Sequence, residues 1–170
     1  GSQILQIAVD EEAQILASLD LNSVIKFYKI DNDKMKLISK FNPMDYDDDL
    51  AVSYISAIPL SSSNSIKFVG FLENGTRIFF YFEEYLEEII LSTKRDPPPL
   101  STSDIIHSAF LSPSYCVFVY ENSIVITHES PNSNEISSLT RELYCVIPIE
   151  SDVLSFSQNI PSIQPTKMSN

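Results

Sequence analysis

The sequence predicts an all-β protein built from four-stranded antiparallel sheets. The first observation is Asn74-Gly75, which stands between two apolar runs, because Asn-Gly is the strongest short-range signal for a two-residue hairpin turn. Both central positions of that turn need φ > 0, which Gly adopts freely and Asn tolerates. The second observation is that similar hairpins are expected on Asn22-Ser23 and Asn122-Ser123, about 50 residues away on either side.

The third observation is that the strand expected after Asn74-Gly75 is apolar on both faces. Ile78, Phe80 and Phe82 would point to one side of the sheet, and Phe79 and Tyr81 to the other. Apolar residues on both faces indicate a strand that is covered from both sides.

The first repeat unit is expected at residues 3–41. Strands are predicted over 4–10, 14–21, 23–30 and 34–41. The turn at Asp31-Asn32-Asp33 is favoured because Asx side chains bond to their own backbone there. Four strands joined by tight turns in about 40 residues form a meander.

The second unit is expected at residues 51–93, after an acidic connector over 42–50. Its strands are predicted over 51–60, 66–73 and 76–82, and its last element covers 83–93. Glutamates in that element would suit a short helix: Glu83, Glu84, Glu87 and Glu88. However, Ile89-Ile90-Leu91 and its place as the outer strand of the unit favour a strand, because outer strands tolerate charge.

The third unit is expected at residues 104–149, after an irregular connector at Pro97-Pro98-Pro99. Strands are predicted over 104–111, 115–121 and 123–129, with a fourth within 139–149. Residues 150–170 are expected to be a linker or tail, because 158–170 is polar and contains Pro161 and Pro165; another strand beginning within 152–157 is the alternative.

Three such units, each of four strands and about 50 residues, are typical of the blades of one β-propeller domain. Blades stack face to face and hide both faces of each sheet, whereas a sandwich leaves one face wet. Closed propellers need about four to eight blades, so we expect about three blades of a longer propeller. Such a segment on its own would expose apolar flanks and self-associate or need a partner chain.

Composition excludes several classes of protein. The 170 residues are 44% hydrophobic and 20% charged, which is ordinary for a globular protein. The net charge of −12 argues against nucleic-acid binding, which needs clustered Lys and Arg. No apolar run reaches the ~18–20 residues of a membrane span. Two cysteines make no disulfide framework, which favours a reducing compartment.

The sequence predicts no catalytic, cofactor-binding or metal site. The aspartates of the connector, at Asp45 and 47–49, lack the Gly and the distal Glu that shape a calcium loop. His107 and His128 have no carboxylate or thiol at ligand spacing. Cys116 and Cys145 lie in apolar runs and are expected to be small core residues. We therefore expect that the protein is not an enzyme.

Three stretches carry a family resemblance. Residues 3–10 (QILQIAVD), followed by ILASL at 15–19 and SVIKFY at 23–28, resemble the "I-x-x-I-A-V-D … L-Y-x-L … G-x-I-x-V-Y" run of large scaffold nucleoporins. Residues 69–82 (VGFLENGTRIFFYF) resemble the "G-V-R-L-Y-F" strand of that family, and residues 106–120 are similar to the segment that follows it. The family is the inner-ring class called one-fifty-five in animals and one-fifty-seven or one-seventy in yeasts.

The resemblance implies a seven-bladed amino-terminal propeller followed by an α-helical solenoid. It implies a structural scaffold of the nuclear pore complex at the nuclear envelope, serving nucleocytoplasmic transport of protein and mRNA. The implied partners are linker and inner-ring scaffold nucleoporins, with peripheral contact to the nuclear membrane and no nucleic acid. No partner-binding residue can be carried over by motif. The alternative is an unrelated propeller interaction module of a vesicle coat or signalling scaffold.

Overall fold

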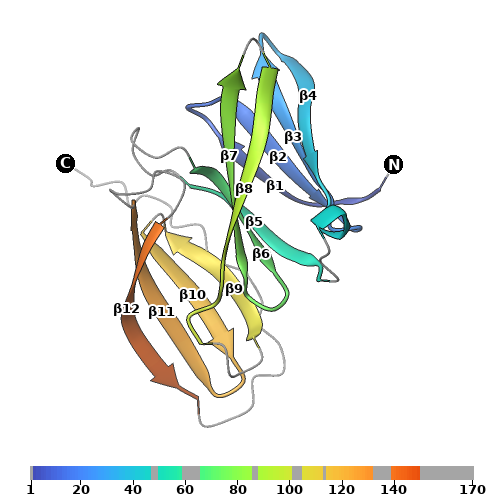
Figure 1. Ribbon diagram of the computed structural model, residues 1–170. Helices are drawn as coiled ribbons and strands as arrows, with labels where there is room; N and C mark the ends of the chain where they lie inside the picture. The colour runs from blue at the N-terminus through green and yellow to red at the C-terminus, as the bar shows by residue number, and fades with distance from the viewer. Residues whose placement is uncertain are drawn as a thin grey trace, which may run out of the picture.

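The computed structural model describes residues 2–46, 50–58, 66–85, 88–100, 105–112, 114–131 and 139–149. In these ranges the chain forms three four-stranded antiparallel sheets, each a simple meander in chain order (Figure 1). The prediction of an all-β protein made of meander blades is confirmed.

The strands of each sheet follow one another along the chain. The first sheet contains β1 (Ile4–Asp10), β2 (Ile15–Asp20), β3 (Ile25–Asp31) and β4 (Lys34–Phe41). The second contains β5 (Val52–Ala57), β6 (Ile66–Leu72), β7 (Arg77–Tyr85) and β8 (Glu88–Asp96). The third contains β9 (Ile105–Ser112), β10 (Tyr115–Tyr120), β11 (Ser123–Pro131) and β12 (Leu139–Pro148). A short 3-10 helix, η1 (Pro43–Tyr46), follows β4.

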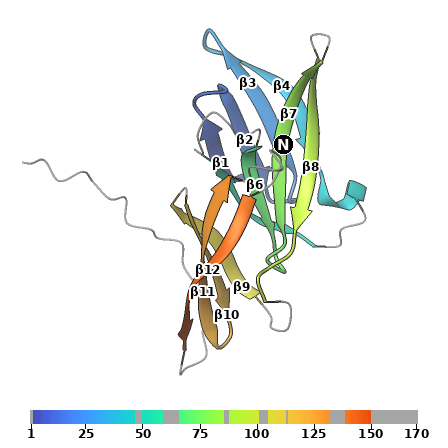
Figure 2. The same cartoon turned by 60° about the vertical axis from the view of Figure 1, so that its left-hand side comes forward.

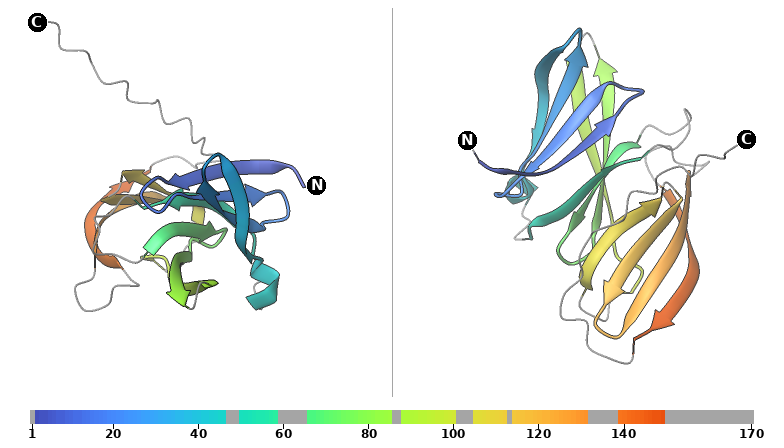
Figure 3. Two further views of the ribbon diagram at one scale, coloured as in Figure 1. Left: turned by 90° about the horizontal axis from the view of Figure 1, so that it is seen from above. Right: turned by 180° about the vertical axis from the view of Figure 1, so that it is seen from behind.

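The three sheets are stacked in chain order, and their first strands are neighbours in space. β5 contacts both β1 and β9, while the last strands β4 and β8 also touch (Figures 2 and 3). This is the arrangement of propeller blades, in which first strands line the axis and last strands form the rim. Residues 150–170, expected to be a linker or tail, lie outside the described residues.

The outer element of the second sheet is a strand, and the alternative of a short helix is wrong for the residues described. Residues 83–85 continue β7, and β8 begins at Glu88, so the division lies further along than the sequence predicts. The pairing explains the difference. Glu83 is paired in register with Ile90 and Glu84 with Ile89, so the backbone of these residues belongs to the ladder between β7 and β8.

The turn at Asn74-Gly75 differs from the predicted two-residue turn. The Gly75 amide donates to the Leu72 carbonyl at 2.9 Å, and the Leu72 amide donates to the Thr76 carbonyl at 2.9 Å. Of the predicted pair only Gly75 has positive φ, at 77°. This is a three-residue loop that ends in a residue in the left-handed region. The turn at Ser23 repeats it, with the Ser23 amide bonded to the Asp20 carbonyl at 2.9 Å and φ of 62°.

A two-residue turn with two positive φ angles occurs instead between β3 and β4. Asn32 and Asp33 have φ of 46° and 63°, and the flanking Asp31 and Lys34 are paired. The third predicted turn, at Asn122-Ser123, is shifted by one residue, because Ser123 already belongs to β11.

The aromatic residues of β7 fill both spaces between the sheets. On one side Phe80 contacts Phe27 and Phe41 of the first sheet, with ring centroids 5.2 and 5.1 Å apart. On the other side Phe79 belongs to a buried cluster that includes Phe118 of the third sheet. The prediction that this strand is covered from both sides is therefore confirmed for Phe79 and Phe80, which are both buried.

The proline connector links the second and third sheets. Pro97-Pro98-Pro99 lies outside any strand, as predicted. The Tyr120 hydroxyl holds its end in place by accepting from the Leu100 amide at 3.0 Å and donating to the Leu100 carbonyl at 3.2 Å.

Replacing Phe80 tests the stacking of the first two sheets. We expect Phe80→Ala to lower the free energy of unfolding by about 3–5 kcal/mol, because it leaves a cavity among buried rings. Phe80→Asp should unfold the chain outright, since it adds an unpaired buried charge. Urea denaturation followed by circular dichroism measures both. Leu143→Ala, at a position 65% exposed on β12, is the matched control and should change stability by less than about 0.5 kcal/mol. Equal losses for Phe80→Ala and the control would contradict the stacking.

Candidate interaction surfaces

The two histidines do not meet. His107 on β9 lies opposite Val119, and His128 on β11 lies opposite Tyr115, which places them at opposite ends of β10. Burial lowers the pKa of His107. Within the described part of the chain, no three His, Cys, Asp or Glu side chains come together where a metal ion could bind.

The cysteines are free thiols in the third sheet. Cys116 is buried, its thiol donates to the Ala109 carbonyl at 3.2 Å, and burial raises its pKa to about 12. Cys145 on β12 is only half-buried. Cys116 thus behaves as the core residue that was predicted, whereas Cys145 lies nearer to the surface.

The acidic stretches form no site among the residues described. Asp45 is exposed in η1, and the other three aspartates of that connector lie outside the described residues. Glu83 is exposed on β7. No described helix is long and apolar enough to cross a membrane.

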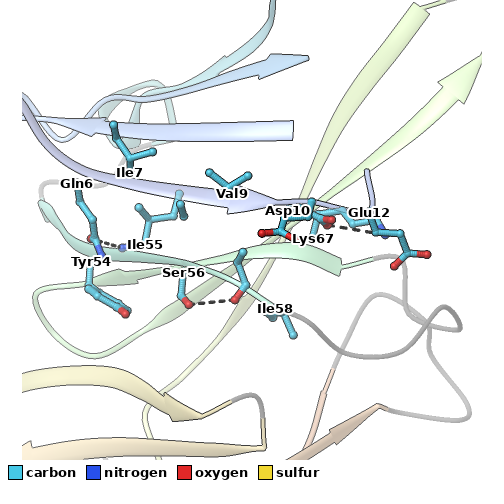
Figure 4. Close-up of a pocket in the computed structure, with 13 residues that line it drawn as sticks. Gln6, Ile7, Val9, Asp10, Glu12, Tyr54, Ile55, Ser56, Ile58 and Lys67 are labelled. Atoms are coloured by element: carbon cyan, nitrogen blue, oxygen red, sulfur yellow. Dashed lines mark hydrogen bonds and ion pairs between the residues drawn. The ribbon is translucent and has the colours of Figure 1, made fainter. Parts of the chain in front are cut away.

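A groove of about 660 Å³ lies between β1 and β5, the first strands of two neighbouring sheets (Figure 4). The Gln6 side chain crosses it and accepts a hydrogen bond from the Ile55 amide at 3.0 Å. At one end Asp10 is paired with Lys67 at 3.9 Å, next to Glu11 and Glu12. The groove therefore combines free strand edges with an acidic end, a surface suited to contact with another chain.

A cluster of charged side chains joins the second and third sheets. Arg77 of β7 is buried, and its Nη1 lies 2.8 Å from Oε1 of the buried Glu129 on β11. The Nε atom of Arg77 donates to Asp96 of β8 at 3.0 Å. Arg141 of β12 pairs with the same Asp96 and donates from Nη1 to the Pro97 carbonyl at 2.8 Å. Two cations and two carboxylates thus alternate across the space between the sheets.

Burial and pairing act in opposite directions on the arginines. Burial alone would lower the pKa of Arg77, but the charges of Glu129 and Asp96 outweigh it and the pKa is raised. For Arg141, burial and the neighbouring Arg77 charge lower the pKa. Aromatic faces complete the site, because Arg77 lies over Phe79 at 5.1 Å and Arg141 over Phe118 at 5.2 Å.

The sequence analysis did not identify this cluster. The available signal was a charged residue inside a run that is otherwise apolar, as Arg77 is before the aromatic residues of β7. Its partner Glu129 and the second arginine of the cluster, Arg141, come from another sheet, and no local spacing connects them to Arg77.

One face of the first sheet is open. It is the face opposite the one packed on the second sheet, and we refer to it as the open face. Across its four strands Val9, Leu16, Tyr28 and Leu37 lie directly opposite one another and form an apolar row. Its exposed apolar residues are Ile7 at 55%, Val9 at 44%, Met35 at 65% and Leu37 at 52%. Contiguous exposed apolar residues mark an interaction surface.

No family model and no curated protein matches the chain. Solved structures do match it, although at low identity. The Nup170 NTD–Nup53 complex of Chaetomium thermophilum matches over 89% of this chain and 29% of that chain, with 14% identity and a TM-score of 0.60. The β-propeller domain of Cps50 (Swd1) from Myceliophteria thermophila matches over 90% and 44%, with 10% identity and a TM-score of 0.53.

A third similar structure is the periplasmic gluconolactonase PpgL of Pseudomonas aeruginosa, over 89% of this chain and 41% of that chain, with 10% identity and a TM-score of 0.53. The chain spans less than half the length of each of these proteins. At such identities the likeness establishes the fold, which is that of β-propeller blades.

Replacing one member of the charged cluster should lower the free energy of unfolding more than replacing an ion pair together. We expect Arg77→Met to lower the free energy of unfolding by about 3–5 kcal/mol, because Glu129 then remains buried without its cation. The double variant Arg77→Met, Glu129→Leu should recover part of that loss, because it removes the unpaired Glu129 charge but leaves the buried Thr127 hydroxyl without the Oε1 acceptor that it reaches at 2.7 Å. Urea denaturation of both single variants and of the double variant provides the measurement. Additive losses would show that the two side chains are not coupled.

The two thiols should differ in reactivity. Because burial raises the pKa of Cys116 to about 12, this thiol is protonated at pH 8 and enclosed, so we expect no alkylation by iodoacetamide in the native state. Cys145 should be alkylated, and both should react in urea. Mass spectrometry of the digested protein distinguishes the sites. Native labelling of Cys116 at the rate of Cys145 would disprove the enclosed core around β10.

Proposed function

We propose that the chain is a segment of a scaffold nucleoporin propeller, a non-enzymatic module of the nuclear pore complex. In this role its sheets present edges and faces to linker and inner-ring nucleoporins at the nuclear envelope, near the pore membrane. The parent propeller would have seven blades and precede a helical solenoid.

The observation that supports this proposal most is the collinear family resemblance over residues 3–130 on a chain that folds as stacked blades. The likeness to the Nup170 NTD, at a TM-score of 0.60, is consistent with it. That structure is a complex with Nup53, so a propeller of this shape is compatible with binding a second nucleoporin.

The features of the described surface suit binding rather than chemistry. The groove between β1 and β5 has acidic residues and strand edges, and its lining contains neither histidine nor cysteine. The charged cluster has its cations paired with carboxylates in the space between two sheets. The open face presents apolar side chains to solvent. The groove and the open face therefore fit contact with protein, whereas the charged cluster is buried and its cations are already paired.

Deleting residues 4–148 from the native polypeptide tests the proposal. We expect loss of the nuclear-rim signal and loss of linker nucleoporin recruitment, because the surfaces that these partners contact would be gone. Fluorescence microscopy of tagged protein provides the measurement, with expression checked by immunoblot. Leu143→Ala, which leaves the fold and the faces intact, is the control and should keep the rim signal. Normal linker recruitment by the deletion variant would count against the proposal, and localisation to vesicles would favour the alternative of a coat component.

A further inference from the structure

The outermost strand of the first sheet differs in charge from the outermost strands of the other two. β8 and β12 each carry both signs of charge. β4 carries Lys34, Lys36 and Lys40 and no acidic residue. β3, which pairs with it, adds Lys26 and Lys29. This hairpin therefore holds five of the 11 basic residues of a chain that has 23 acidic ones.

The lysines are placed where they repel one another. Lys26 is in register with Lys40, and Lys29 is in register with Lys36. Like charges directly opposite each other destabilise a sheet. Lysines on an outer strand guard its free edge against wrong pairing. That role does not account for Lys26 and Lys29, because β3 lies inside the sheet between β2 and β4. The paired lysines therefore point to a partner that supplies the opposite charge.

The carboxylates of the chain do not neutralise this hairpin. None of its five lysines makes an ion pair with a residue that the structure describes. Asp31 is in register with Lys34, but no ion pair forms between them. Asp20, on the same face as Lys26, accepts hydrogen bonds from two backbone amides of the following turn. By contrast, the cations of the groove and of the charged cluster all face carboxylates.

The backbone of β4 has a free edge. β4 stands last in its sheet and pairs only with β3 among the described strands. In a two-residue hairpin the residues that flank the turn, here Asp31 and Lys34, exchange both of their hydrogen bonds, and the direction of the backbone groups then alternates. The amides and carbonyls of Met35 and Leu37 therefore point away from β3. Their side chains are 65% and 52% exposed.

This edge stays accessible when a sheet is covered on both faces. The second sheet packs on the first sheet with one face and on the third with the other. On its outermost strand, β8, Ile90 is nevertheless 45% exposed and Arg95 is also exposed. A further blade stacked on the first sheet would therefore leave the β4 edge open.

We propose that an extended acidic segment of another protein adds to the free edge of β4 as a fifth strand. The side chains of Lys34 and Lys36 lie on one face of β4, and those of Met35 and Leu37 lie on the other. The matching segment alternates carboxylate and apolar residues, so that its carboxylates lie beside the lysines and its apolar residues beside the methionine and the leucine. The inference rests on the proposed function for its setting, and it adds the surface and the chemistry of one partner.

An extended segment fits the hairpin better than a flat acidic surface does. Lys29 and Lys36 lie on one face of the sheet, whereas Lys26 and Lys40 lie on the other. A flat surface docked on either face would reach only one of these pairs. A strand along the edge lies between the two faces and presents side chains to both.

Fluorescence anisotropy with the 170-residue chain and labelled peptides tests the charge and the alternation. The probe is Glu-Val-Glu-Val-Glu-Val-Glu-Val, and the comparison peptides are Glu-Glu-Glu-Glu-Val-Val-Val-Val and Lys-Val-Lys-Val-Lys-Val-Lys-Val. We expect the probe to bind roughly tenfold more tightly than either comparison peptide, because only the probe matches both faces of β4. Raising the salt concentration should weaken its binding, since exposed charges are screened.

Matched variants of the chain locate the contact. The double variant Lys34→Gln, Lys36→Gln should weaken binding of the probe roughly tenfold, because two cross-strand charge pairs are lost. The double variant Lys67→Gln, Lys94→Gln changes the net charge equally but lies away from the β4 edge. It is the control and should change the affinity by less than about twofold.

Backbone pairing is tested separately from charge. Met35→Pro removes an outward amide and no hydrogen bond of the ladder between β3 and β4, so circular dichroism should stay unchanged while binding falls roughly tenfold. A probe with N-methylated valines makes the same test on the unaltered chain, since the valine amides are those that would face β4.

Several outcomes would overturn the proposal. They are equal affinity for the alternating and block peptides, equal losses in the two double variants, and unchanged affinity for the N-methylated probe. Self-association of the chain that Lys36→Gln abolishes, measured by sedimentation velocity, would assign the edge to a second copy and would also overturn it. None of these measurements depends on where the protein resides in the cell, so a failure here is distinguishable from a failure to reach the nuclear rim.

Discussion

The covering of β7 from both sides is the constraint on which the rest of the structure depends. Successive residues of this strand alternate between two interfaces, with Ile78 and Phe80 facing the first sheet and Arg77 and Phe79 facing the third. A slip of one residue would exchange the two sets and put the Arg77 guanidinium among the phenylalanines of the first interface. Gly70 belongs to the same constraint, because a Cβ there would lie 3.0 Å from the Phe80 ring. The order of the three sheets therefore follows from the register of one strand.

The covering of β7 from both sides could be predicted from the sequence, because it depends only on the alternation of apolar residues along the strand. The turns were less predictable, because their geometry depends on which flanking residues pair. Asn74-Gly75 suggested a two-residue turn, but pairing of Leu72 with Thr76 makes a three-residue loop. The two-residue turn with two positive φ angles, which was expected at Asn74-Gly75, is instead adopted by Asn32-Asp33, a pair without glycine. Likewise, two of the glutamates that suggested a helix, Glu83 and Glu84, are paired in register with Ile90 and Ile89, a relation that appears only once β8 is placed beside β7.

The charged cluster between the second and third sheets could not be predicted at all. In the sequence Arg77 is recognisable only as a charged residue within an apolar run. Glu129 and Arg141 lie in a separate sheet. Buried ion pairs add little stability over apolar residues of the same size, but a missing partner is costly. The cluster therefore destabilises the packing of a sheet that lacks the matching charges more than it stabilises the packing of the sheet that has them. A sheet can pack on this side of the second sheet without leaving a buried charge unpaired only if it meets two conditions. It must supply a carboxylate for Arg77, as Glu129 does, and it must place its own cation beside Asp96, as Arg141 is placed.

The same reasoning extends from the interior to the surface. The chain carries a net charge of −12, yet β3 and β4 with their turn contain five lysines, at positions 26, 29, 34, 36 and 40. An acidic protein with a basic hairpin repels acidic partners over much of its surface and attracts them at that hairpin. A free strand edge alone would accept any extended segment, including one from a copy of the same chain. The lysines beside the β4 edge make selection possible, because an acidic segment gains a partner for each cation, whereas a neutral or basic segment would leave the cations unpaired.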